Sequence, residues 1–166
     1  VLSHKDAAEL RSRQIGFIFQ TICLLQFYTV FENVEFPLLL LGLNAKERRT
    51  MVMEALDRVG LADRAKSRPN QLSGGQSQRV AISRAIVKRP RLVLADEPTA
   101  NLDAENSHNI IQTMERLNQD LDTTFIFSTH DEKVIGYLKR TITLEDGRVA
   151  SDRRLSDGVA RGGDRP

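Results

Sequence analysis

The stretch Leu92–Pro98, LVLADEP, decides the fold, because it is an apolar run that ends in two consecutive carboxylates. A continuous apolar run of about four to eight residues is typical of a parallel strand that is buried on both faces. A second run, TTFIFST (Thr123–Thr129), follows an amphipathic segment with Ile110, Met114 and Leu117 on one side. Strand, helix and strand at this spacing predict a βαβ unit, and therefore an α/β fold with a parallel sheet.

Polar side chains end the predicted strands. Asp96 and Glu97 close the LVLAD run, and Gln20 ends an earlier strand-like run, IGFIFQ (Ile15–Gln20). Because α/β sheets bind ligands beyond the carboxyl ends of their strands, Asp96 is predicted to hold Mg²⁺ and Glu97 to polarise an attacking water. The amide of Gln20 could ligate Mg²⁺ or that water. A solvated acidic turn is the alternative for Asp96 and Glu97, and the pattern leaves it open.

The strand-like run after Thr123 ends in STHD (Ser128–Asp131). Since parallel strands end at the same edge of a sheet, we expect His130 to lie beside Glu97. His130 is therefore a candidate catalytic residue. His4 and His108 have no such context and are expected at the surface.

The segment LSGGQSQRV (Leu72–Val80) combines a hydroxyl, adjacent glycines and a glutamine before a helical pattern. Bare glycine backbone lets N–H groups approach a ligand, and a helix N-terminus favours an anion. The pattern predicts that a phosphate is gripped here, by Leu72, Ser73, Gly74, Gly75 and Gln76. None of the ten glycines precedes a lysine, so these residues contain no phosphate-cradling loop of the Gly-Lys-Ser or Gly-Lys-Thr type.

Composition narrows the function classes. A 166-residue chain with 40% apolar and 28% charged residues is typical of a globular domain, and a net charge of +2 does not favour a nucleic-acid or anionic-membrane partner. The single cysteine, Cys23, excludes an intrachain disulfide, agrees with a reducing cytoplasm and is expected to be buried. The longest apolar stretch, Phe36–Leu43, is far shorter than the roughly 20 residues of a membrane span.

One cluster of basic residues lies near the LSGGQ helix. Without interleaved aromatic residues, a solvated helix face is a better interpretation than a nucleic-acid patch. Asp103, in TANLDAEN, precedes a helical pattern and is expected to cap it, which is compatible with a role at a ligand site. The basic cluster comprises Arg79, Arg84, Lys88, Arg89 and Arg91.

In order, Gln20, LSGGQ, LVLADEP, NLD and STHD resemble the motifs of the nucleotide-binding domain of ABC-type ATPases, over nearly all of residues 13–150. The resemblance implies that Gln20 is the Q-loop glutamine and that Leu72–Gln76 is the signature motif. It also implies the remaining roles: the Walker B aspartate is Asp96, the catalytic glutamate Glu97, the D-loop Ala100–Asp103 and the switch histidine His130.

The resemblance implies a P-loop NTPase-like parallel sheet core, present in part, with an α-helical subdomain and a C-terminal β-hairpin. The alternating run TITLEDGRVAS (Thr141–Ser151) itself predicts this hairpin, with its turn at Asp146-Gly147. By the resemblance, residues 1–151 form a partial ABC ATPase domain. Residues 21 to about 85 would be the helical subdomain and residues 86–151 the remainder of the RecA-like core. The segment 152–166 is expected to be a disordered tail, because it has almost nothing to bury.

The resemblance also implies cofactors and partners, namely ATP, Mg²⁺, a second ABC ATPase domain and an integral membrane permease subunit. In this family the two ATPase domains pair head to tail, and the signature motif of one contacts the γ-phosphate of ATP on the other. The expected activity is ATP hydrolysis that powers transport, from the cytoplasmic face of the inner (plasma) membrane. ENVEFPLLL (Glu32–Leu40) and ADEPTANLD are most similar to the lipoprotein-releasing and macrolide-export group, and no nucleic-acid partner is expected.

The chain departs from the family because the Walker A loop and the first strands are not among its residues. We therefore expect an N-terminally truncated domain that binds ATP poorly by itself. The alternatives are a non-catalytic dimerisation partner and a soluble ABC ATPase, the latter being expected to carry a coiled-coil insertion or a second cassette. Leu24, Phe27 and Phe31 could dock a helix of the permease, and core packing is the alternative for each.

Overall fold

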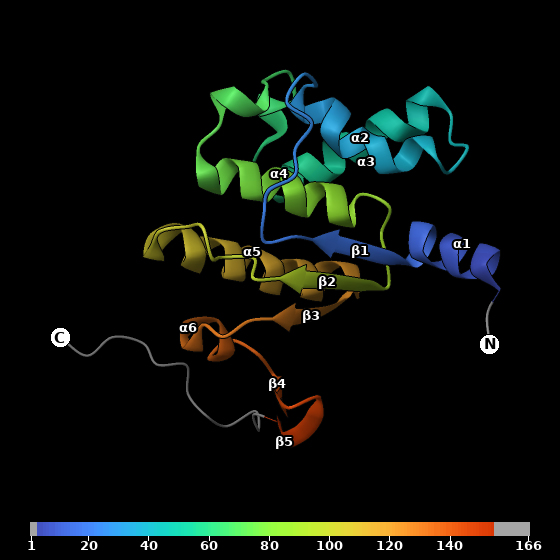
Figure 1. Cartoon of the computed structure of the whole chain (residues 1–166). Helices are drawn as coiled ribbons and strands as arrows, with labels where there is room; N and C mark the ends of the chain where they lie inside the picture. The colour runs from blue at the N-terminus through green and yellow to red at the C-terminus, as the bar shows by residue number, and fades with distance from the viewer. Residues whose placement is uncertain (1–2, 155–166) are drawn as a thin grey trace. The chain divides into compact units, whose positions relative to one another are not determined.

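The computed structural model describes residues 3–154 (Figure 1). The chain divides after Ser128 into two compact units, which are described separately. The first unit contains α1 (His4–Gln14), β1 (Ile15–Ile18), α2 (Val30–Leu39), α3 (Ala45–Arg58), α4 (Gly74–Ile86), β2 (Leu92–Asp96), α5 (Ala104–Leu121) and β3 (Thr124–Ser128), with 3-10 turns at Ala62–Arg64 and Pro69–Gln71. The second contains α6 (Glu132–Ile135), β4 (Arg140–Glu145) and β5 (Arg148–Arg154).

The first unit is built on a three-stranded sheet in the order β1-β2-β3. Both strand pairs are parallel, with Ile18 opposite Ala95 and Asp96 opposite Ser128. The expected βαβ unit is therefore confirmed as β2, α5 and β3. Parallel strands end at one edge of the sheet, so Ile18, Asp96 and Ser128 lie at the same edge.

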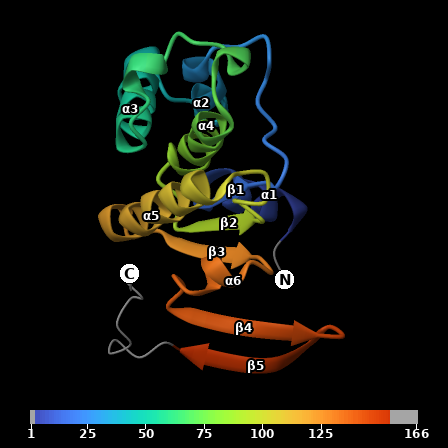
Figure 2. The ribbon, with the colours of Figure 1, turned by 90° about the vertical axis from the view of Figure 1, so that its left-hand side faces the viewer.

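One face of this sheet is covered by α4 and α5 (Figure 2). Ile18, Val93 and Ala95 on this face are at most 2% exposed, and they belong to the same core as Ile110 and Met114 of α5. Gly16 allows the close approach of α4, because a Cβ atom there would lie 2.5 Å from the carbonyl oxygen of Ala85. The inner-face residues of β1 and β2 are thus shielded from water, while Phe125 and Phe127 of β3 are half-buried against the same core.

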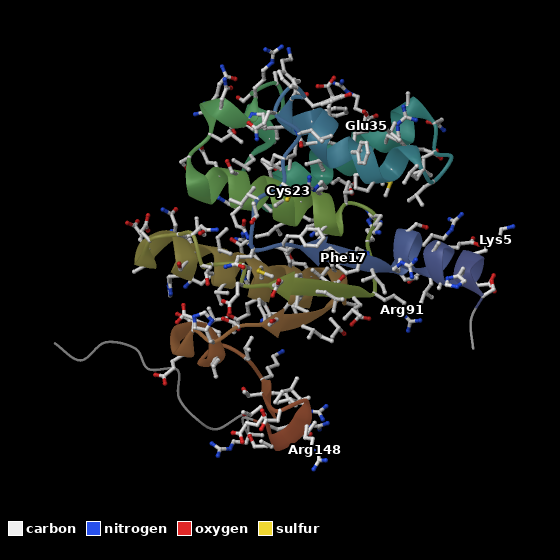
Figure 3. All side chains as sticks on the ribbon, in the orientation of Figure 1. Lys5, Phe17, Cys23, Glu35, Arg91 and Arg148 are labelled. Carbon is white, nitrogen blue, oxygen red and sulfur yellow. The ribbon has the colours of Figure 1, made fainter. Side chains whose placement is uncertain are left out.

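The other face of the sheet is not buried to the same extent. Phe17 of β1, labelled in Figure 3, is 38% exposed, and Ile126 of β3 is 53% exposed. The expectation that β2 and β3 are buried on two faces is therefore wrong for β3, whereas Leu92 and Leu94 on the outer face of β2 are half-buried. The physical reason is that α4 and α5 both pack on the opposite face.

Three helices, α2, α3 and α4, pack on one another (Figure 1). A capping box begins each of them: Thr29 with Glu32 before α2, Asn44 with Glu47 before α3, and Ser73 with Gln76 before α4. In such a box the side chains of the two residues satisfy backbone N–H groups that the first helical turn leaves free. Local sequence therefore sets where these helices start.

The three proposed docking residues, in the segment after β1 and at the start of α2, differ in their exposure. Leu24 is 7% exposed and belongs to the core, and Phe31 is half-buried against it. Phe27, by contrast, is 92% exposed. Cys23 is exposed rather than buried, because it lies in this loop segment outside the helices, and the expectation for it is wrong.

Three basic residues of the α4 cluster connect separate segments of the chain. Arg84 donates a hydrogen bond to the Cys23 carbonyl at 2.5 Å, and Arg89 pairs with Glu54 at 2.7 Å. The Lys88 ammonium contacts the carbonyl oxygens of Arg11 and Ser12 at the end of α1. Burial lowers the pKa of both Arg84 and Lys88, because desolvation disfavours their charged forms. These three cations therefore hold other segments of the chain, which the interpretation as a solvated helix face did not include.

The second unit contains the expected antiparallel hairpin of β4 and β5. Its turn is formed by Asp146 and Gly147, both with positive φ, as two-residue hairpin turns require. Arg140 and Asp152 form a two-point ion pair across the strands. β5 continues through Arg154, beyond the expected boundary at residue 151, and residues 155–166 of the expected tail lie outside the described residues.

In residues 3–154, no helix is both long and apolar enough to cross a membrane.

Candidate functional site

The carboxyl edge of the sheet brings together the segments that follow β1 and β2. Asp96 ends β2 with an exposed side chain, and Glu97 comes directly after it with a half-buried one. Gln20 lies two positions beyond the end of β1 and is exposed. The Nδ2 group of Asn101 donates a hydrogen bond to the Gln20 carbonyl oxygen at 3.0 Å. The structure therefore links the Gln20 segment directly to the loop that follows Glu97.

Glu97 has a left-handed backbone, with a φ of 42°. Residues other than glycine adopt this conformation only where their surroundings hold it. The Glu97 N–H donates to the Ser128 carbonyl at 2.9 Å, and the Glu97 carbonyl accepts from the Ala100 N–H at 3.2 Å. The conformation turns the chain between β2 and the loop, directly after Asp96.

The signature segment Leu72–Gln76 forms the N-terminus of α4. Ser73 is the cap, and its Oγ accepts from the Gln76 N–H at 3.3 Å while the Gln76 side chain accepts from the Ser73 N–H at 2.9 Å. Ser73 and Gly74 are exposed. The helix N-terminus therefore presents backbone N–H groups and a positive dipole end to solvent, an arrangement that suits an anion.

Gly75 is buried against the start of α5, where an added Cβ atom would collide with the side chain of Asn106. Asn106 is itself held by Asp103, which accepts from the Asn106 backbone N–H at 2.8 Å and from its side-chain amide at 2.7 Å. The signature segment and the Asp103 segment of one chain are therefore in direct contact. This contact requires glycine at position 75.

Asp103 caps α5 as expected. Hydrogen bonds from the backbone and side chain of Asn106 lower the pKa of the Asp103 carboxyl below its ordinary value. The carboxylate is thus held ionised next to the signature segment. The capping role and a role at a ligand site remain compatible.

His130 belongs to the second unit and Glu97 to the first. The side chain of His130 is exposed. Its expected position beside Glu97 stays a prediction.

Gln78 was not singled out from the sequence, and Asn101 was named only as part of the NLD motif and the expected D-loop Ala100–Asp103. Gln78, 2% exposed, donates from Nε2 to the Pro98 carbonyl at 2.7 Å, and Asn101 contacts the Gln20 segment as described above. A signal for Gln78 exists in the sequence, since it is a polar residue on the helix that carries the apolar run Val80–Ile82. The motif did not predict the contact of the Asn101 side chain with the Gln20 carbonyl, because an asparagine in a turn is ordinary.

The donor chemistry at this edge fits Mg²⁺ with a phosphate-bearing ligand. Mg²⁺ is usually held by one or two carboxylates together with substrate phosphates and waters, and Asp96 offers an exposed carboxylate at a strand end. Within residues 3–154 no cluster of three or more His, Cys, Asp or Glu side chains could hold a metal ion. An ion at this edge would therefore take further ligands from a nucleotide and water.

Comparison with known proteins gives the family. Residues 2–100 match the family described as ABC transporter. The chain is 46% identical over 145 residues to the lipoprotein-releasing system ATP-binding protein LolD of Geobacter metallireducens, covering 87% of this chain and 64% of that protein. It is 42% identical over 163 residues to the ABC transporter ATP-binding protein YtrE of Bacillus subtilis, covering 97% of this chain and 65% of that protein.

Solved structures agree with this result. The ATP-binding cassette MJ0796, solved as a dimer in a post-hydrolysis state bound to ADP and Pi, superposes with a TM-score of 0.79 at 38% identity, covering 93% of this chain and 68% of that chain. CbiO1 of Clostridium perfringens, part of the ABC transporter complex cbiONQ, gives a TM-score of 0.85 at 31% identity, covering 92% of this chain and 61% of that chain.

The parallel sheet, the helices on its inner face and the polar edge define an α/β nucleotide-binding fold of the ABC ATPase type. The chain belongs to the ABC transporter family, as its ATP-binding domain. It spans a little under two thirds of the length of the first relatives it matches, 64% in the case of the Geobacter LolD.

Proposed function

We propose that this chain is part of the ATP-binding and ATP-hydrolysing subunit of an ABC transporter that powers export or lipoprotein release. The observation that carries the proposal is the meeting of three motif segments around the loop Pro98–Asp103. That loop contacts the Gln20 segment through Asn101 and α4 through Gln78, and Asn106, which is bonded to Asp103, packs against Gly75 of α4. By this proposal, residues 1–151 form a partial ABC ATPase domain with a helical subdomain at about 21–85.

Each polar group at the site has a proposed role. Asp96 holds Mg²⁺, which neutralises charge on the transferred phosphoryl group, and Gln20 ligates the same ion or the attacking water. Glu97 orients and polarises that water, since it follows Asp96 directly at the carboxyl edge of the sheet. His130 contacts the γ-phosphate region as the switch histidine.

The signature segment serves a nucleotide on a second ABC ATPase domain in a head-to-tail dimer. Ser73 and Gly74 are exposed at the N-terminus of α4, so their backbone groups are accessible to a phosphate from outside the chain. Asp103 lies against the same segment and belongs to the same dimer interface. The dimeric structure of MJ0796 supports this proposal by its family relationship.

A membrane permease subunit is the second proposed partner, which places the protein on the cytoplasmic face of the inner membrane. Exposed apolar side chains support a docking surface on α2 and the loop before it. Phe36, Leu39 and Leu40 are spaced so that they share one side of the helix end, and they are 52%, 52% and 77% exposed. Phe27, at 92% exposed, lies shortly before the same helix.

The first test is steady-state ATP hydrolysis. The 166-residue chain contains no glycine-rich loop with lysine, so we expect it to bind and hydrolyse ATP poorly by itself. A chimera with a Walker A segment of the family joined before Val1 should hydrolyse ATP. In that chimera Glu97→Gln should bind ATP and form a stable dimer without turnover. Normal turnover of the Glu97→Gln chimera would refute the role of Glu97.

A second candidate function is a non-catalytic dimerisation partner, and the exposed N-terminus of α4 favours it. The 166-residue chain would then associate with a full-length relative without hydrolysing ATP itself. Sedimentation of the chain with such a relative, with and without ATP, tests this function. A matched Ser73→Arg variant should lose the ATP-dependent association, because the bulky side chain blocks the helix N-terminus.

A further inference from the structure

The side-chain amide of Gln78 is buried beside the site. Gln78 lies in the second turn of α4 and is 2% exposed. Its Nε2 group donates to the Pro98 carbonyl oxygen at 2.7 Å, in a contact that is itself buried. A buried amide is tolerated only when it is hydrogen-bonded, so this contact is specific rather than incidental.

The partner of Gln78 is the residue that follows the strained turn at Glu97. Pro98 has no N–H group, so its carbonyl is the backbone group by which another element can hold it. Glu97 keeps a φ of 42°, and the two backbone hydrogen bonds at this turn involve only β3 and the loop itself. Gln78 adds a hydrogen bond from α4, a separate element of the fold.

The same face of α4 contacts both ends of the loop. Gly75 and Gln78 are three positions apart and therefore lie on one side of the helix. Gly75 packs against Asn106, which is bonded to Asp103 at the end of the loop, while Gln78 holds Pro98 at its beginning. A shift of the N-terminus of α4 must therefore move or release the loop Pro98–Asp103.

We propose that Gln78 is a positioning residue: its amide fixes the Pro98 carbonyl and thereby holds the Glu97 turn in place relative to the N-terminus of α4. The inference rests on the proposed function for its consequence. If the N-terminus of α4 grips a nucleotide on another chain, Gln78 links that contact to the placement of Glu97 in its own chain. Engagement of one site is thus transmitted to the other through Gln78 at the start of the loop, alongside the contact of Gly75 with Asn106 beyond its end.

The matched pair for the test is Gln78→Met and Ser83→Ala. Methionine keeps the length of the side chain and removes the donor. Ser83 is a buried residue of the same helix whose Oγ donates to the Ala55 carbonyl, so its removal also costs α4 a buried hydrogen bond, directed away from the loop. A purely structural role of Gln78 predicts the same outcome for both variants.

Amide hydrogen exchange by NMR on the 166-residue chain is the first measurement. In Gln78→Met we expect exchange at Glu97 and Ala100 to be roughly tenfold faster than in Ser83→Ala, the change that follows from loss of one hydrogen bond. Equal exchange rates in the two variants would overturn the inference. If Gln78→Met does not fold, the inference is tested on the unaltered chain, by the exchange rate of the Gln78 side-chain NH₂ protons. Side-chain NH₂ protons of Gln78 that exchange as fast as those of the exposed Gln71 would overturn the inference too.

Kinetics of the Walker A chimera are the second measurement. We expect Gln78→Met to lower kcat about tenfold or more with KM for ATP unchanged, because the group that orients water is displaced while nucleotide binding is retained. Ser83→Ala should retain both parameters. Absence of hydrolysis in the unaltered chimera would count against the proposed function and leave the exchange result standing. If the chimera hydrolyses ATP and its Gln78→Met variant has an unchanged kcat, the positioning role of Gln78 is refuted while the proposed function stands.

Discussion

The two faces of the three-stranded sheet are both apolar in sequence and differ sharply in their surroundings. Ile18 on the inner face is 1% exposed beneath α4 and α5, whereas Ile126 on the outer face is 53% exposed. The difference teaches that an apolar sequence only makes a strand residue suitable for burial. Whether the residue is buried depends on whether a helix packs on that face of the sheet. Alternation along the strand then separates the two environments by a single residue.

The two faces of the sheet also have different roles: the inner face stabilises the fold, and the outer face offers a surface for interaction. The inner face holds the first unit together through the core that includes Val93 and Ala95. The outer face contributes apolar surface that is available for contact, with Phe17 and Ile126 both more than a third exposed. Substitutions that are chemically identical should therefore have different effects on the two faces.

The largest expected effect is the difference in the free energy of unfolding between isoleucine-to-alanine substitutions on the two faces of the sheet. Ile18→Ala should lower the free energy of unfolding by about 2–5 kcal/mol, because it leaves a cavity beneath α4. Ile126→Ala should lower it by about 1 kcal/mol or less, since much of that side chain is already in water. Urea unfolding followed by circular dichroism measures both values. Equal losses would break the distinction between the faces.

The next effect concerns the closeness of α4 to the inner face. Gly16→Ala should cost about 1–3 kcal/mol, because the new Cβ would lie 2.5 Å from the Ala85 carbonyl oxygen and force the helix away. Gly74→Ala is the control, since its nearest contact beyond the helix is an ordinary 3.6 Å from Leu102. Thermal unfolding of both variants is the measurement. A stable Gly16→Ala variant would show that the helix can retreat without loss.

A smaller effect is expected on the outer face, and it concerns association. Ile126→Lys places a charge among exposed apolar side chains and should reduce concentration-dependent self-association while leaving unfolding nearly unchanged. Sedimentation velocity over a range of concentrations measures the first property and thermal unfolding the second. Unchanged association would mean that this face takes no part in contacts between chains.

The smallest effect is the acid dependence of the cap of α5. The pKa of Asp103 is lowered from the ordinary 3.8 by its hydrogen bonds to Asn106, so the ionised form stabilises the fold above that value. This stabilisation is lost as the pH falls below 3.8 through the lowered value of the folded state. Asp103→Asn retains a capping oxygen without titrating, and its stability should fall less steeply in acid. Thermal unfolding below pH 4 should separate the two proteins, and parallel curves would contradict the prediction.

Much of the fold and part of the candidate site could be predicted from the sequence. The βαβ unit, the capping of α3 by Asn44 and of α5 by Asp103, and the hairpin turn at Asp146-Gly147 all follow from local patterns. They are predictable because apolar period, capping and turn chemistry act between residues a few positions apart. The exposure of Cys23 and of Ile126 was not predictable, because burial depends on which element packs where.

The sequence by itself located the end of β2 and the starts of α4 and α5, and so it identified Asp96, Glu97 and Ser73 as candidates. Only the tertiary structure decided which of these segments touch. Gln78 reaches Pro98 from 20 positions away, and Asn101 reaches Gln20 from 81. Such contacts leave no periodic trace in a single sequence, because they are set by the packing of α4 and α5 on one face of the sheet.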